Sequence, residues 1–260
     1  MSKKLTKDQI RNPDQLTAQL QKSFNWSVGH SKTVLALVAA FLVLWGGYAL
    51  YAGISESKEQ KVQEKLYIAE KDYLTTKQNF EDAEKPDLAA DDKKAKSEPK
   101  KETAKVKSTG DLQKDYGPSL EKFNQIIASN PDSKAALMAA LYSSEILGKY
   151  NQNETALNTL KKVTLHKDLL SSLVLNRTAA LQADMNNCAE AIKSWDAVIK
   201  NKDVSYLHNE AKLRQALCHE SMNNVAQAEK IYTELQADAT KSESSKLAAK
   251  YLRLIKVKTN

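Results

Sequence analysis

The chain has 260 residues, of which 42% are hydrophobic, and its net charge is +7. Only 7 glycines and 5 prolines occur, and β-branched residues form no alternating runs, so the composition predicts an all-α protein with a sizeable core. The positive excess lies largely in two segments. Residues 1–32 carry six Lys/Arg against two acids, and 86–110 carry seven against five. Without a basic stripe interleaved with exposed aromatics, this excess does not predict nucleic-acid binding.

Residues 33–55 form the longest uncharged stretch of the sequence. As a helix rising about 1.5 Å per residue it would extend roughly 34 Å, enough for a bilayer core of about 30 Å. Trp45, Tyr48 and Tyr51 gather near its end, as is typical of a membrane interface. We therefore predict a transmembrane helix. A cleaved signal peptide and a buried core helix are the alternatives, but the apolar run is long for the first and too uniformly apolar for the second.

The lysines and arginines before this stretch are less diluted by acids than those after it, which predicts a cytoplasmic N-terminal segment over 1–32. The predicted location is the bacterial inner (cell) membrane, crossed once, with a periplasmic C-terminal domain.

Residues 56–85 carry an apolar stripe at helical spacing, at Val62, Leu66, Ala69, Tyr73, Thr76 and Phe80. This amphipathic helix either packs on the next domain as the first solenoid helix or pairs in a homo-oligomer.

Residues 86–110 are rich in Lys, Ala, Glu and Ser and nearly free of apolar side chains, which predicts a basic disordered linker. A repeat follows in 111–260. With a shift of 37 residues, Met185-Asn186-Asn187 falls on Met222-Asn223-Asn224, and Trp195 falls on Tyr232. A period in the thirties is typical of a helical solenoid. The turns between helices are expected at Leu147-Gly148, Met185-Asn186 and Met222-Asn223.

The second helices of these pairs resemble the tetratricopeptide (TPR) pattern, with a small residue followed by large apolar ones four and seven positions later. The matching sets are Ser119, Phe123 and Ile126; Ala156, Leu160 and Val163; Ala191, Trp195 and Val198; and Ala228, Tyr232 and Leu235. The small residue lets the paired helix approach closely. Residues 242–257 predict a helix that caps the end of the solenoid.

Side chains with catalytic or metal-binding chemistry are scattered. The four histidines follow no zinc spacing, and there is no phosphate-binding Gly-rich loop, nucleophile elbow or Cys-x-x-Cys. We therefore expect no enzyme, no cofactor and no metal. Cys188 and Cys218 fall on adjacent antiparallel helices, where they either form a disulfide in an oxidising compartment or serve as small buried hydrophobes.

The order of these segments resembles the YfgM-like family, ancillary subunits of the bacterial Sec translocon. The resemblance rests on a Leu/Gln/Phe-bearing segment over 16–24, the Trp45-Gly46-Gly47-Tyr48 ending of the uncharged stretch, and a helix following at 62–73. It extends to the first-helix segments 175–179 and 213–216 and to Leu247-Ala248-x-x-Tyr251-Leu252. The long basic linker departs from the family layout.

The resemblance implies a non-enzymatic membrane-anchored adaptor whose partners are translocon subunits, periplasmic chaperones or emerging secreted chains. The rival expectation is a scaffold for peptidoglycan or outer-membrane assembly. The concave face of a solenoid offers a groove for polypeptides. By the repeat frame, first-helix residues line this protein-binding groove: Asn176, Ala180, Ala183, Leu213, Leu217 and Glu220.

Overall fold

The computed structural model describes residues 24, 26, 28, 30–85, 106–238 and 241–259. The chain divides into two compact units, 1–58 and 59–260. The N-terminal segment 1–23 and most of the predicted linker, 86–105, lie outside the described residues.

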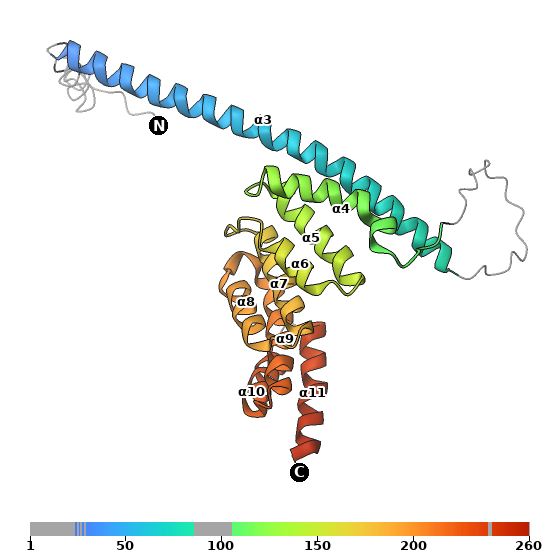
Figure 1. Ribbon diagram of the computed structural model, residues 1–260. Coiled ribbons are helices and arrows are strands. Elements are labelled where there is room, and N and C mark those ends of the chain that lie inside the picture. The colour runs from blue at the N-terminus through green and yellow to red at the C-terminus, as the bar shows by residue number, and fades with distance from the viewer. Residues whose placement is uncertain are drawn as a thin grey trace, which may run out of the picture. The chain divides into compact units, whose positions relative to one another are not determined.

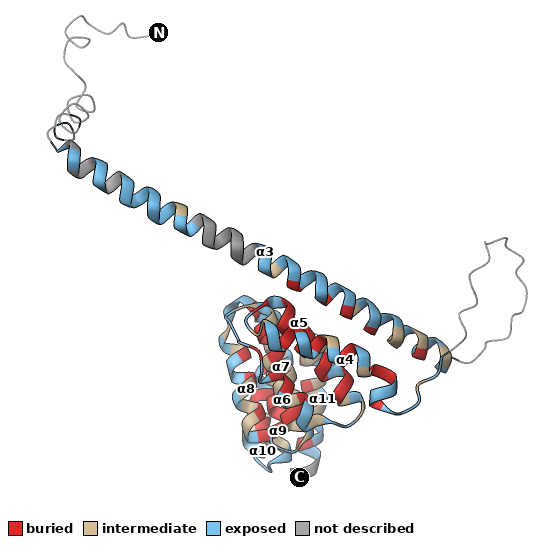
Figure 2. Cartoon of the chain, turned by 45° about the horizontal axis from the view of Figure 1, so that its top comes forward, coloured by how far each residue is buried: buried red, intermediate tan, exposed pale blue. Residues whose placement is uncertain are grey.

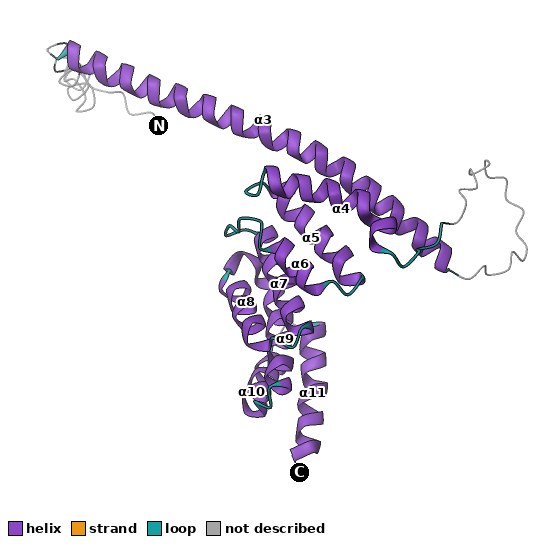
Figure 3. Ribbon diagram, in the orientation of Figure 1, coloured by secondary structure: helices purple, strands orange, loops and turns teal. Residues whose placement is uncertain are grey.

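The described residues form helices and no strand (Figure 3), so the predicted all-α class is confirmed. The first helix is α3 (Ser31–Glu84), which contributes to both units. The second unit then contains, in chain order, α4 (Leu112–Ser129), α5 (Lys134–Lys149), α6 (Asn153–Leu160), α7 (Leu169–Asp184), α8 (Cys188–Lys200), the 3₁₀ helix η1 (Lys202–Leu207), α9 (His208–Ser221), α10 (Val225–Gln236) and α11 (Glu243–Thr259).

The prediction of a transmembrane helix over 33–55 is wrong. Within the described residues, no helix combines the length and the apolar character that a bilayer crossing demands. The prediction of a single-pass inner-membrane protein with a periplasmic domain is corrected accordingly.

In the second unit, five of the six stripe positions predicted for 56–85 are buried against α4 and α5 of the same chain (Figure 2), and the sixth, Thr76, is partly exposed. Val62, Leu66, Ala69, Tyr73 and Phe80 are each at most 6% exposed. The Tyr73 ring packs against Tyr116, Phe123 and Tyr142. The flanks carry polar contacts from Asp72 to Lys122 and from Lys77 to Glu145. The apolar surface that would pair in a homo-oligomer is therefore covered.

From α4 onward the helices pack in the order of the sequence (Figure 1), which is consistent with an α-solenoid. Their apolar side chains form three successive core clusters. The first joins the second-unit part of α3 to α4, α5, α6 and α7, the next joins α7, α8, η1 and α9, and the last joins α9, α10 and α11. Helices α7 and α9 each belong to two clusters, so they connect neighbouring parts of the core.

Three turns between helices have the same geometry. Asn151, Asn186 and Asn223 have φ of 59°, 60° and 60°, the left-handed conformation that ends a helix. In each turn the next residue donates its N–H to a carbonyl five positions earlier, at 2.8–2.9 Å. The turn expected at Leu147-Gly148 therefore lies later, at Asn151, because Gly148 still belongs to α5.

The small and large positions expected in the second helices are buried in all four sets. Ala156, Ala191 and Ala228 are fully buried, and their large partners pack beside them at 0–8% exposure. The fourth set, on α4, begins with Ser119 at 5%. This burial explains why the pattern recurs, since a larger residue at the alanine positions would push the paired helices apart.

The segment just before α4 is held by one carboxylate. Asp115 accepts hydrogen bonds from the Ser108 and Tyr150 hydroxyls at 2.6 and 2.7 Å and from the Thr109 hydroxyl at 2.7 Å, and it also accepts from the N–H groups of Thr109 and Gly110. Burial opposes the charged form of Asp115, but these hydrogen bonds outweigh it and hold its pKa well below the usual range. Residues 106–110 are thus fixed to the helical unit, although they were expected to be linker.

Candidate functional site

Three of the six predicted groove residues come together in one pocket. Ala180 and Ala183 of α7 and Leu217 of α9 line a hollow of about 200 Å³ that opens to solvent. Trp195 and the sulfur atoms of Cys188 and Cys218 help to form its walls, and Asp184, Arg214 and Ser221 are its remaining lining residues. The pocket therefore combines an apolar surface with two opposite charges.

The other three predicted residues are engaged elsewhere. Asn176 accepts a hydrogen bond from the indole N–H of Trp195 at 3.0 Å, and Glu220 accepts one from the Tyr232 hydroxyl at 3.3 Å. Leu213 is only 5% exposed and belongs to the core cluster of α9, α10 and α11. These side chains connect first helices to second helices. Helical spacing alone does not distinguish such positions from positions that face solvent.

Cys188 and Cys218 are joined by a disulfide, with their Cα atoms 5.2 Å apart. The bond connects the start of α8 to the last turn of α9, and so joins two neighbouring helix pairs beside the pocket. Ser221 lies 3.2 Å from the Cys188 sulfur through its hydroxyl. The disulfide fixes the wall of the pocket covalently.

One repeat earlier, the place that corresponds to this pocket is occupied by the side chain of Arg177. Arg177 of α7 donates to the Ser144 carbonyl at 2.9 Å and to its hydroxyl at 3.3 Å. It lies over Gly148, where an added Cβ would be 2.5 Å from the guanidinium. Glycine is needed here because it leaves room for the arginine.

Aligning the repeats on their turn asparagines shows why the later pocket stays open. Gly148 lies three residues before Asn151, and Ala183 lies three before Asn186; by the same alignment Ala179 replaces Ser144. Arg214 stands where Arg177 does, nine residues before its turn asparagine. By this alignment Ala183 carries a methyl group where Gly148 has none, and Ala179 has no hydroxyl to accept a hydrogen bond.

Arg214 consequently stays at the surface. Its side chain is 54% exposed, and it forms a loose ion pair with Glu210, 3.6 Å away and one helical turn earlier. Exposed pairs of this kind contribute little, about 0.3–0.5 kcal/mol. Arg177 and Arg214 coincide under the 37-residue shift of the repeat, so the shift alone does not predict this difference. The sequence signal for it is alanine in place of glycine at the matching position, Ala183 for Gly148.

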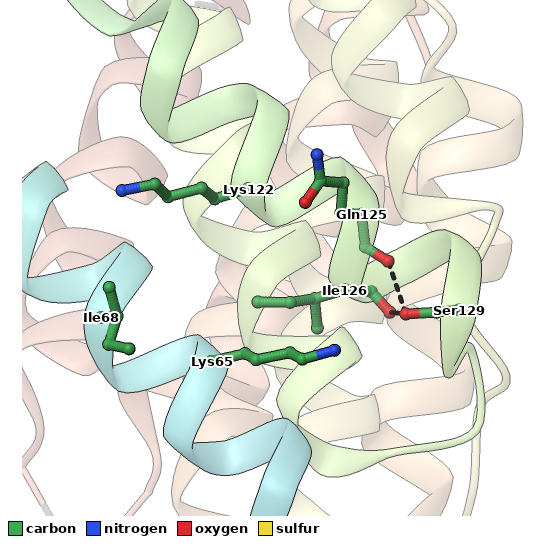
Figure 4. A pocket seen from close by; sticks show the side chains of 6 residues that line it. All are labelled: Lys65, Ile68, Lys122, Gln125, Ile126 and Ser129. Atoms are coloured by element: carbon green, nitrogen blue, oxygen red, sulfur yellow. Dashed lines mark hydrogen bonds between the residues drawn. The ribbon is translucent and has the colours of Figure 1, made fainter.

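Two further hollows lie nearer the start of the solenoid. Figure 4 shows the first, about 250 Å³ between α3 and α4, where Ile68 and Ile126 lie between Lys65 and Lys122. Lys122 already forms an ion pair with Asp72. The second is wider, about 890 Å³, and follows α4 past the short helix α6. Its lining mixes amides and hydroxyls such as Gln113, Asn124 and Thr155 with apolar residues and two charged ones.

Metal-ligating side chains form no candidate site in the part of the chain that the structure describes. No cluster of three or more His, Cys, Asp or Glu side chains there could hold a metal ion. His208 contacts the carbonyl of Asn201 at 2.9 Å, while burial lowers the pKa of His219 against the opposing effect of Asp196. The pocket at Ala183 and Leu217 presents a small apolar surface, one cation (Arg214) and one anion (Asp184).

Comparison of the chain with protein-family models, with curated proteins and with solved structures finds no match.

Proposed function

We propose that the chain is a non-enzymatic adaptor that binds polypeptide partners through the face formed by its first helices. The observation that carries this proposal is the open pocket lined by Ala180, Ala183 and Leu217, which come from two different helix pairs. Solenoids bind partners along such faces because successive repeats present equivalent side chains side by side.

The repeat is best described as TPR-like. The second-unit part of α3 pairs with α4, α5 with α6, α7 with α8, and α9 with α10, and α11 follows as a cap on the last pair. Support comes from the buried small residues of the second helices and from the three equivalent asparagine turns. Tyr251 of α11 stacks on Tyr232 of α10, with ring centroids 5.6 Å apart, as a capping helix would.

The class of partner comes from the resemblance to the YfgM-like family, and it comprises chaperones, newly exported chains and translocon subunits. The second candidate, a scaffold for envelope assembly, would use the same face for wall or outer-membrane factors. Crosslinking in cells followed by purification in mild detergent separates them. Recovery of chaperones or translocon subunits supports the adaptor, and recovery of wall or outer-membrane factors alone supports the scaffold.

A substitution in the pocket tests the binding face directly. Ala183→Arg should fill the pocket and reduce the recovered partners several-fold, while circular dichroism shows the helical content unchanged. Ala226→Arg is the matched control, because Ala226 is exposed on α10 and outside the pocket. Equal recovery of partners by both variants and the unmodified chain would place the binding face elsewhere.

A further inference from the structure

We infer that Arg214 anchors an acidic side chain of the bound polypeptide, with a small apolar neighbour of that residue seated against Ala180, Ala183 and Leu217. This inference rests on the proposed function and names the chemistry that the pocket recognises. It starts from the contrast between Arg177, which donates two hydrogen bonds to Ser144, and Arg214, which occupies the equivalent position and forms only a loose ion pair with Glu210.

The guanidinium of Arg214 lacks the intramolecular site that its counterpart has. Arg177 uses the carbonyl and hydroxyl of Ser144 and lies over Gly148. At the matching positions Ala183 adds a methyl group where Gly148 leaves room for the guanidinium, and Ala179 has no hydroxyl. Arg214 is therefore available at the pocket wall, and planar guanidinium groups bind carboxylates through two parallel hydrogen bonds.

The competing contact inside the chain is weak. Glu210 lies 3.6 Å from Arg214 on the same helix, with both side chains about half exposed. A bound carboxylate that is partly shielded by the pocket replaces this pair at little cost, because exposed pairs at this spacing add only tenths of a kcal/mol.

Asp184 sets the limit of this preference. It lines the same pocket from the exposed end of α7, and its charge opposes a second acidic group. The pocket therefore favours a segment with one carboxylate beside small apolar residues over a run of acids. We therefore expect that removing the Asp184 charge strengthens the binding of an acidic segment.

The experiment measures fluorescence anisotropy of the full chain with a labelled alanine peptide that carries one central Glu and blocked ends. Arg214→Gln should weaken binding about tenfold, the loss expected for one charge-assisted bidentate contact. Asp184→Asn should strengthen it a few-fold. The paired change Ala179→Ser and Ala183→Gly should rebuild the site that Arg177 uses, draw Arg214 inward and also weaken binding, although the arginine is kept.

Arg253→Gln, on the exposed side of α11, is the matched control and should bind like the unmodified chain. A peptide with Gln in place of Glu, once with blocked ends and once with a free C-terminal carboxylate, identifies the carboxylate that is recognised. Equal binding of the blocked Glu and Gln peptides overturns the inference, as does preference for the free C-terminus. If Arg214→Gln binds normally while Ala183→Arg still loses its cellular partners, the anchor fails and the adaptor function stands.

Discussion

Ser143 carries a buried hydroxyl that has no hydrogen-bond partner among the described residues. A polar group of this kind loses its water without compensation, so its removal costs nothing. We expect Ser143→Ala to raise the free energy of unfolding by up to about 1 kcal/mol in urea denaturation. Ser144→Ala is the control and should lower it, because that hydroxyl donates to the Leu141 carbonyl and accepts from Arg177. A loss of stability in Ser143→Ala would show that its hydroxyl is bonded.

Asp115 makes stability depend on pH. Its folded-state pKa is depressed below the ordinary value of about 3.9, because the charged form accepts hydrogen bonds from 108–110 and Tyr150. Its contribution is therefore complete above that ordinary value and is lost as pH falls through it toward the folded-state pKa. We expect Asp115→Asn to cost about 2 kcal/mol at pH 7 and to flatten the acid limb of the stability curve. An unchanged acid limb would assign the pH dependence to other carboxylates.

At the scale of single elements, the asparagine turns are the units that repeat most faithfully. Asn186 adopts φ of 60°, which costs residues other than glycine and asparagine roughly 1–2 kcal/mol. We expect Asn186→Ala to lower the free energy of unfolding by about 1 kcal/mol and Asn186→Gly to change it little, as measured by thermal melts. Asn187 makes no side-chain capping bond, so Asn187→Ala should be nearly neutral. Similar losses for both alanine variants would contradict the role of the turn.

The helices and their buried positions could be predicted from the sequence because apolar residues recur with helical spacing. The stripe from Val62 to Phe80 and the set of Ala191, Trp195 and Val198 are buried as that spacing requires. The turn near Gly148 could not be placed, because this glycine serves the approach of Arg177 and does not end the helix. A glycine has more than one structural use, and the distant partner decides which one applies.

The candidate pocket was only half predictable for a related reason. Helical spacing identifies first-helix positions, but the side chains of neighbouring helices decide which of them reach solvent. Asn176 is hydrogen-bonded to Trp195 and Glu220 to Tyr232, whereas Ala180 and Ala183 line the open pocket. Such pairings depend on the rotation of each helix about its axis, and that rotation is set by the whole core.

At the scale of the second unit, the core consists of three clusters. The first two share α7 and the last two share α9, so these helices connect the stability of neighbouring repeats. In a solenoid each repeat contacts only its neighbours, so cooperativity depends on the links between them. The Cys188–Cys218 disulfide strengthens one such link, because it joins α8 to α9 across a separation of 30 residues. A loop of this length corresponds to about 3–4 kcal/mol of lost unfolded-state entropy.

Removing that bond should therefore divide the unfolding of the unit. We expect the Cys188→Ser, Cys218→Ser double variant to lose about 3 kcal/mol and to melt in two steps, with α9, α10 and α11 opening first. Hydrogen exchange resolved by residue is the measurement, with the unmodified chain under reducing conditions as the control. The reduced control should match the double variant, since both lack only the covalent link. Exchange that rises equally in α5 and α10 would instead show that packing through α7 and α9 alone keeps the unit cooperative.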